Sequence, residues 1–301
     1  MLNENVKPST LVGIKRLATS IKNEQGILHS QALNLSAIQS GFESFRHAQN
    51  SLKNNTKHPS KITVYLTRSW KDRNTGEKGL ELLTVMLEEP WENFVTAAQL
   101  KFNRGLGDFY TAIPDHLDHR YLATSQSSAR QSLCVAARNL QFMQATKLRP
   151  NDSFRIYPKG QSINAVPGRD HYSGWYDAKS KRYLFVDEPY APAVADMKVE
   201  RETWAKLHNQ EIALSPWEGM YNPDGGSRMF LIADKVKGVP IKPLLTILEK
   251  LPPPLTLENW NGESRPYLPP FISPGAVEKD KIIRAKIEDS LARRKAGRLS
   301  R

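Results

Sequence analysis

Two segments of the chain share one order of parts, and each predicts a β-hairpin. Residues 70–91 read Trp-Lys-Asp, an Asn-Thr-Gly turn, an apolar stretch and Glu-Glu-Pro-Trp. Residues 175–190 read Trp-Tyr-Asp, a Lys-Ser-Lys turn, an apolar stretch and Asp-Glu-Pro-Tyr. Ahead of the first turn, Ile62, Val64 and Leu66 alternate with other residues at the period of a strand. An antiparallel sheet is therefore expected.

An internal duplication is one interpretation of the paired segments. The two Glu-Pro pairs lie 99 residues apart and the two Trp residues 105 apart, so the second hairpin would be six residues shorter. Two unrelated hairpins are the alternative, because an aromatic residue followed by a turn is common in hairpins. A third hairpin is expected from the turn residues at 220–226 and the apolar stretch at 229–233.

Helical patterns accompany the hairpins. Residues 126–147 form the clearest one, with apolar side chains every three or four positions and Arg138 among the cations expected on the solvated face. Shorter patterns occupy residues 91–102 and the stretch around Leu244 and Leu248. Hairpins packed with helices predict an α+β fold, with a small helical bundle before this body and a basic helix after it.

The first fifty residues predict three short helices. Ser9 or Thr10 caps the first, Ser30 the second and Ser44 the third, while Gly26 and Gly41 provide stops. We therefore expect a helical module at 1–55 and an α+β body at 60–251. A Pro-rich arm at 252–275 and a basic helix at 276–301 would complete the chain.

The arm contains seven prolines between Pro252 and Pro274, which exclude a helix or a central strand. Either it lies across the body through Trp260, Tyr267 and Phe271, or it is a stiff linker.

Composition indicates a cytoplasmic protein. No run of roughly 18 apolar residues is present, so no membrane span is expected. One cysteine, Cys134, excludes a disulfide framework, and its place beside a helical apolar stripe predicts a buried side chain rather than a nucleophile.

The formal net charge of +12 is concentrated at the two ends. Residues 1–61 carry a net +5, residues 278–301 another +5, and the remainder only +2. Basic ends around a neutral body are typical of contacts with DNA or RNA. The alternatives are solvated cations, or a helical module that binds another protein. The candidate nucleic-acid contacts are Lys15, Arg16, Arg46, His47, Lys53, Arg293, Arg294 and Lys295.

His116 and His119 lie in the segment Asp-His-Leu-Asp-His and are candidate metal ligands. If the segment were helical, both imidazoles would share a face, and a third ligand would come from elsewhere in the chain. A capped helix start or a loop is the alternative.

A second constellation combines His171 with Asp187 and Glu188. His171 enters one predicted strand and the acids leave the next, so a hairpin could join them for general acid–base catalysis. The alternative is structural: the acids cap a helix and bind a nearby arginine.

Recognisable enzyme motifs are absent from the sequence, including a phosphate-binding loop, GxSxG, HExxH and paired CxxC. We therefore favour a non-enzymatic accessory protein that binds nucleic acid or a partner associated with it. A metal-dependent or acid–base enzyme and a protein-interaction scaffold are the alternatives.

Residues 13–22, 29–33 and 41–48 together resemble a short helical module found at the N-terminus of several bacterial families, including glyoxalase-related proteins. Joined to Val-Asp-Glu-Pro-Tyr at 186–190, this opening resembles a bacterial family described only as a domain of unknown function. The resemblance covers most of the chain and implies neither an activity nor site residues. The metal site of glyoxalases does not transfer, because only the helical module matches.

Overall fold

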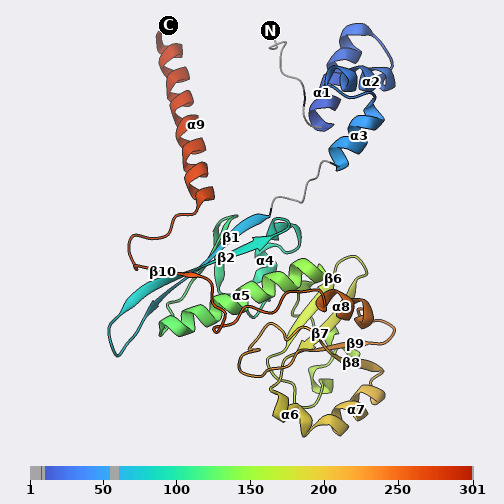
Figure 1. Cartoon of the computed structure of the whole chain (residues 1–301), viewed down its shortest axis with the longest axis vertical. Coiled ribbons are helices and arrows are strands. Elements are labelled where there is room, and N and C mark those ends of the chain that lie inside the picture. The colour runs from blue at the N-terminus through green and yellow to red at the C-terminus, as the bar shows by residue number, and fades with distance from the viewer. Residues whose placement is uncertain (1–7, 9–10, 55–60, 300–301) are drawn as a thin grey trace. The chain divides into compact units, whose positions relative to one another are not determined.

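The computed structural model describes residue 8 and residues 11–54 and 61–299. Contacts divide the chain into two compact units, residues 1–60 and residues 61–301, shown in Figure 1. The α+β prediction is confirmed, with packed N-terminal helices, two five-stranded sheets and a C-terminal helix.

Three helices form the first unit: α1 (Leu11–Gln25), α2 (His29–Gln39) and α3 (Phe45–Asn54). Gly26 and Gly41 follow the first two helices with φ of 65° and 91°, a conformation that glycine adopts without strain. Ser44 caps α3 by accepting the His47 N–H, whereas α2 begins before Ser30, with Leu28 at its N-cap. The unit has apolar clusters of its own, one of them made of Ile14, Ala37, Ala48, Phe42 and Phe45.

The first sheet has the strand order β10-β2-β1-β4-β3. The predicted hairpin of β1 (Ile62–Lys71) and β2 (Lys78–Leu87) forms its centre. On one side β4 (His116–His119) runs parallel to β1 and pairs with β3 (Phe109–Ile113). On the other side β10 (Glu263–Arg265) pairs with β2, although about 180 residues separate the two strands along the chain.

The second sheet has the strand order β5-β6-β7-β9-β8, and its pairs are antiparallel. β6 (Ser173–Asp177) and β7 (Arg182–Asp187) form the second predicted hairpin, with β5 (Arg149–Pro150) beside it. β8 (Gln210–Leu214) and β9 (Phe230–Asp234) form the third. Residues 220–226, which were expected to form its turn, lie within the longer connection between these two strands.

The first two hairpins share one turn geometry. Asp72 accepts the backbone N–H groups of Asn74 and Thr75, and Asp177 accepts those of Lys179 and Ser180. The residue after each of these pairs, Gly76 or Lys181, has a φ of 75° or 59°. The neighbouring strands differ, because the first hairpin adds a parallel strand beside β1 and the second adds an antiparallel strand beside β7.

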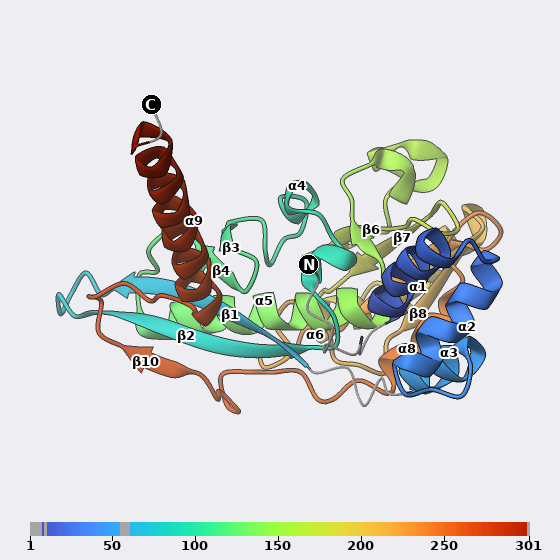
Figure 2. The ribbon, with the colours of Figure 1, turned by 90° about the horizontal axis from the view of Figure 1, so that it is seen from above.

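The helix that periodicity predicts at 126–147 is α5 (Gln126–Thr146), and it packs between the two sheets (Figures 1 and 2). It contacts β1, β2 and α8 (Ile241–Leu248), and the Phe142 ring lies 4.7 Å from the Trp175 ring of β6. The prediction of a solvated Arg138 is wrong: this side chain is fully buried within the core. Its charge is accommodated there because three backbone carbonyl oxygens accept its hydrogen bonds.

The prediction of one helix at 91–102 is also wrong. A 3₁₀ turn, η1 (Trp91–Asn93), is followed by a single helical turn, α4 (Ala97–Leu100). Thr96 separates them, because its hydroxyl accepts the Gln99 N–H and so starts a new helix. Burial of the apolar residues does not require a continuous helix, since Trp91 and Phe94 already reach the core from η1 and its end.

Residues 154–207 contain short elements. They are the 3₁₀ turns η2 (Phe154–Ile156), η3 (Pro158–Gly160) and η4 (Ser162–Asn164), and the helices α6 (Ala191–Ala195) and α7 (Lys198–Leu207). Of these elements, η2 contacts β7 and α7 contacts β8 in the second sheet.

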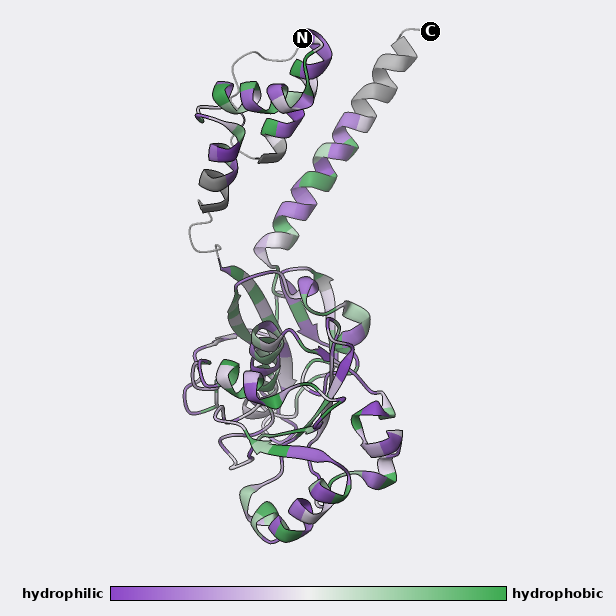
Figure 3. Ribbon diagram, turned by 90° about the vertical axis from the view of Figure 1, so that its right-hand side faces the viewer, coloured by the Kyte–Doolittle hydropathy of each residue, from purple (hydrophilic) through white to green (hydrophobic). Residues whose placement is uncertain are grey.

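The Pro-rich arm lies across the second unit. Its Pro252 oxygen accepts the Trp217 Nε1–H at 3.0 Å, and the Phe271 ring lies 5.1 Å from the His116 ring. After the arm, α9 (Pro274–Leu299) is anchored at its start, where Asp115 accepts the Ser273 hydroxyl and the Gly275 N–H. Hydrophilic and hydrophobic residues are mixed along the coloured part of α9 (Figure 3). No helix in the described ranges is long and apolar enough to cross a membrane.

Candidate functional site

The N-terminal unit exposes predicted nucleic-acid contacts on two helices. The exposed side chains are Lys15 and Arg16 on α1 and Arg46 and His47 on α3. Ile14, next to Lys15 in the sequence, is fully buried in the core of the unit. His47 Nδ1 accepts the Glu43 N–H and lies 3.6 Å from the Glu43 carboxylate. The side chains of Lys53, Arg293, Arg294 and Lys295 lie outside the described residues. The described cations are thus exposed to solvent on two helices of a small packed bundle.

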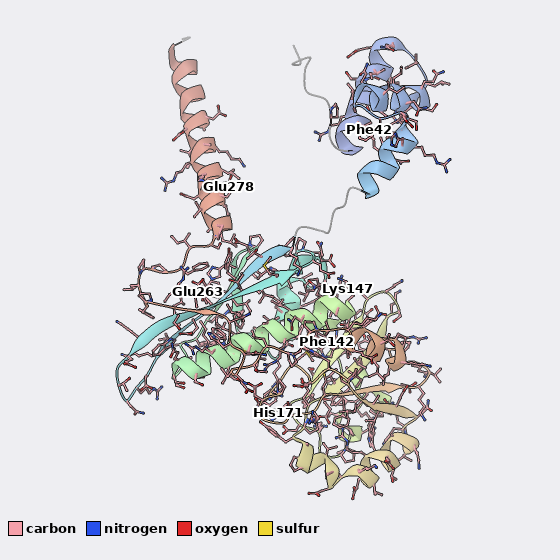
Figure 4. The ribbon with its side chains drawn as sticks, in the orientation of Figure 1. Phe42, Phe142, Lys147, His171, Glu263 and Glu278 are labelled. Carbon is pink, nitrogen blue, oxygen red and sulfur yellow. The ribbon has the colours of Figure 1, made fainter. Side chains whose placement is uncertain are left out.

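His171 lies just before β6, in an aromatic setting (Figure 4). Its ring stacks on Tyr221 with centroids 3.7 Å apart and meets the edge of Tyr190 at 5.7 Å. Nε2 lies 3.1 Å from Asp170, while the buried Nδ1 atom has no hydrogen-bond partner. Burial lowers the pKa of His171, and Arg104 adds to that shift. Stacking on Tyr221 and the Nε2 contact with Asp170 therefore hold the imidazole.

Asp187 ends β7 and is fully buried beside a buried arginine. One carboxylate oxygen lies 2.8 Å from Arg201 on α7, and the other accepts the Asp170 N–H at 2.8 Å. Burial raises the pKa of Asp187, and the Arg201 guanidinium opposes the shift. This buried pair ties α7 to the end of β7, which matches the structural alternative for this acid.

Glu188 is buried and binds backbone. Its Oε1 accepts the N–H groups of Met220 at 2.6 Å and Tyr221 at 2.9 Å. Gly219 has a φ of 118°, and a Cβ atom there would lie 2.5 Å from the same oxygen, so only glycine fits. Burial raises the pKa of Glu188 to about 7. The structure thus brings His171, Asp187 and Glu188 into one region, but neither acid forms a hydrogen bond with the imidazole among the described residues.

The two metal-ligand candidates lie on a strand rather than a helix. Residues 116–119 form β4 because they pair in parallel with β1, which sequence periodicity alone does not reveal. Strand alternation places His116 and His119 on opposite faces. His119 packs against Phe109 with ring centroids 5.0 Å apart. No group of three or more His, Cys, Asp or Glu side chains suited to a metal ion occurs in the part of the chain that the structure describes.

His116 belongs instead to a hydrogen-bond network that sequence reasoning missed. Its Nε2 lies 2.7 Å from the Thr67 hydroxyl, which donates to Asp118 Oδ1 at 2.6 Å. The Tyr110 hydroxyl donates to the other Asp118 oxygen at 2.6 Å. Since the Thr67 hydrogen points to Asp118, His116 must donate through Nε2–H. The sequence signal is the i, i+2 pair His116 and Asp118, which shares one face of a strand.

This hydrogen-bond network borders a cavity of about 350 Å³. The Pro-rich arm covers the cavity with Tyr267, Phe271 and neighbouring residues. The hydrogen bond to Asp118, together with burial, raises the pKa of Tyr110 to about 12. Burial lowers the pKa of His116, which favours the neutral imidazole. The cavity therefore presents a neutral histidine, a carboxylate and two hydroxyls to a small molecule.

Cys134 is buried on α5, and burial raises the pKa of its thiol to about 11. Because the thiolate is the reactive form, this cysteine is unsuited to nucleophilic catalysis.

Comparison with protein-family models, with curated proteins and with solved structures gives no match.

Proposed function

We propose that this chain is a cytoplasmic nucleic-acid-binding protein whose N-terminal helical unit contacts phosphates. The observation that carries the proposal is the set of exposed cations on α1 and α3, opposite the buried face of a self-contained bundle. Lys and Arg on a helix surface neutralise phosphates and release counterions, which supplies much of the affinity of such proteins.

The α2–α3 pair supports this proposal. The two helices are joined by a short turn at Gly41, and α3 carries Arg46 and His47 close to its N-terminus. A helix that enters a nucleic-acid groove typically contacts it through N-terminal residues of this kind. The residues of the basic C-terminal helix would add phosphate contacts.

Replacing Lys15, Arg16 and Arg46 with glutamine is expected to weaken DNA binding and to reduce the slope of log affinity against log salt by about 3. The matched control replaces Lys206, Lys242 and Lys250, which are exposed on the second unit and carry the same total charge. Fluorescence anisotropy with a mixed-sequence duplex and a single-stranded RNA measures both effects. Equal losses in the two variants would contradict the proposal. So would a partner protein that binds residues 1–55 while nucleic acid does not, since that result indicates a scaffold.

The hydrogen-bond network of His116, Thr67, Asp118 and Tyr110 favours a second candidate function. This function is acid–base chemistry on a small molecule in the cavity beneath the arm. With Nε2–H donating to the Thr67 hydroxyl, the Nδ1 atom of the neutral His116 imidazole is the one that would accept a proton from a bound molecule. The sequence alternative of an enzyme in the α+β body is thus retained, with His116 in place of His171.

Replacing Thr67 with valine tests whether the hydrogen-bond network around His116 exists. The substitution keeps the shape of the side chain but leaves buried polar partners unpaired. The free energy of unfolding measured by urea denaturation should therefore fall by about 1–3 kcal/mol. Thr63→Val, near the other end of β1, is the control and should change stability by less than about 0.5 kcal/mol. The ¹⁵N shifts of His116 should report Nε2–H in the wild type. A Nδ1–H tautomer there, with no effect of Thr67→Val, would remove this candidate.

A further inference from the structure

A second cavity, of about 580 Å³, lies in the second unit among segments distant in sequence. η2 and η3, the β6–β7 turn, the α7–β8 connection and the turn after β9 form its walls. We propose that this cavity binds a nucleoside polyphosphate. Its volume lies within the range of about 300–1,000 Å³ that is usual for small-molecule sites.

The charges that line the cavity favour an anion. Arg155, Lys159, Lys181 and Lys237 each contribute a cation from a different place in the chain, and each is exposed enough to meet a ligand. Asp234 is the single carboxylate among the lining residues. Its Oδ1 already accepts the N–H groups of Val236 at 2.9 Å and Lys237 at 2.8 Å. The cavity therefore has a formal excess of positive charge suited to several phosphate groups.

An aromatic side chain beside the cations favours a planar base as well as phosphates. Tyr183 lines the cavity half-buried, and the Arg155 guanidinium lies 5.9 Å from its ring centroid. Tyr157 also lines the cavity, but its ring is buried in an apolar cluster with Phe185 and Trp204. A nucleobase can stack on a tyrosine or a guanidinium plane, whereas inorganic phosphate gains nothing from either.

Backbone conformation points to the same place. Lys159, Lys181 and Asn209 line the cavity with φ of 56°, 59° and 54°. They are three of five non-glycine residues in the described ranges with a left-handed backbone. Lys181 owes its conformation to the hairpin turn, and Asn209 directly follows the C-cap of α7, so Lys159 is the residue of the three whose strained backbone favours a ligand site.

Because the net charge of the body is near neutral, the composition of the sequence did not reveal this site. The four cations lie between residues 155 and 237, separated by acidic residues, so composition averages them out. Only folding gathers them around one cavity. The proposal does not depend on nucleic-acid binding by the N-terminal unit, because it concerns different residues.

Calorimetry on the full chain at low ionic strength tests the proposal with ATP, adenosine and inorganic tripolyphosphate. ATP should bind more tightly than either fragment. Lys159→Gln with Lys237→Gln should weaken ATP binding about tenfold or more, while the control Lys242→Gln with Lys250→Gln should change it less than about twofold. Tyr183→Leu should weaken ATP binding more than tripolyphosphate binding, because ATP loses the stacking ring as well as the contact that positions Arg155.

Three results would overturn the proposal: no ATP binding by the wild type, equal losses in the two lysine pairs, or tripolyphosphate binding as tightly as ATP. Tighter binding of a 5′-phosphorylated oligonucleotide at the same residues would contradict a free nucleotide as the ligand. DNA binding by the Lys159/Lys237 variant should equal that of its control. This result separates a failure here from a failure of the proposed nucleic-acid function.

Discussion

Replacing Arg138 with alanine is expected to lower the free energy of unfolding by about 3–5 kcal/mol. The guanidinium is fully buried, donating to the Met220 oxygen at 2.8 Å and the Tyr221 oxygen at 2.7 Å. Its third partner, the Leu255 oxygen, belongs to the Pro-rich arm. Truncation leaves one buried and two partly buried carbonyl oxygens without these donors, and the loss is most costly at the buried Met220 oxygen, which water does not reach.

Urea denaturation measures this effect, with Arg73→Ala as the control. Arg73 is exposed in the β1–β2 turn, and its loss should cost less than about 0.5 kcal/mol. Arg138→Lys keeps the charge without the planar fork of donors, so an intermediate loss is expected. An Arg138→Ala protein within about 1 kcal/mol of the wild type would show that this side chain does not hold the arm and the 220–221 segment together.

Glu188 should make stability depend on pH. Burial raises its pKa from an ordinary 4.5 to about 7 in the folded protein. Between these values the folded chain retains a proton that the unfolded chain releases, so stability falls as the pH rises through this window. A shift of this size corresponds to about 3 kcal/mol.

Glu188→Gln isolates the effect, because the amide resembles the protonated acid and its oxygen can accept the same two N–H groups. The stability of the wild type relative to Glu188→Gln should fall by about 3 kcal/mol between pH 4.5 and 7 and stay constant above that range. Glu211→Gln, on an exposed side chain of β8, is the control and should show no such trend. Parallel pH profiles for wild type and Glu188→Gln would contradict a buried, proton-retaining Glu188.

Arg138 and Glu188 act on the same short segment. Arg138 binds the carbonyl oxygens of Met220 and Tyr221, and Glu188 binds their N–H groups. A buried guanidinium and a buried carboxyl group thus fix the backbone that carries Tyr221, on which His171 stacks. This arrangement gives Glu188 a structural role, although its sequence context also fitted catalysis.

Local patterns predicted the parts of the fold that local interactions determine. The apolar period of α5, the alternation of β1 and the turns after Asp72 and Asp177 each depend on residues close in sequence. The strand at His116 did not follow from its sequence, because it forms by pairing with β1 about fifty residues away. Burial of Arg138 likewise depends on carbonyl groups 82 to 117 residues away.

Candidate sites were harder to predict for the same reason. His171, Asp187 and Glu188 come together as a hairpin should bring them, but their partners Arg201 and Tyr221 lie in later segments and define structural roles. The hydrogen bonds of Thr67 with His116 and Asp118 also form only when β1 and β4 pair in the folded protein. By contrast, the exposure of Lys15, Arg16 and Arg46 follows from helical period alone, since the apolar residues of α1 and α3 occupy another face.

A salt titration of nucleic-acid binding by the full chain tests the central proposal most directly. Anisotropy of a labelled mixed-sequence duplex, measured over a range of salt concentrations, gives the slope of log affinity against log salt. Phosphate contacts by the exposed cations of the N-terminal unit predict a linear fall with a slope of about −3 or steeper. Binding that does not change with salt, or no binding at the lowest salt concentration, would contradict the account.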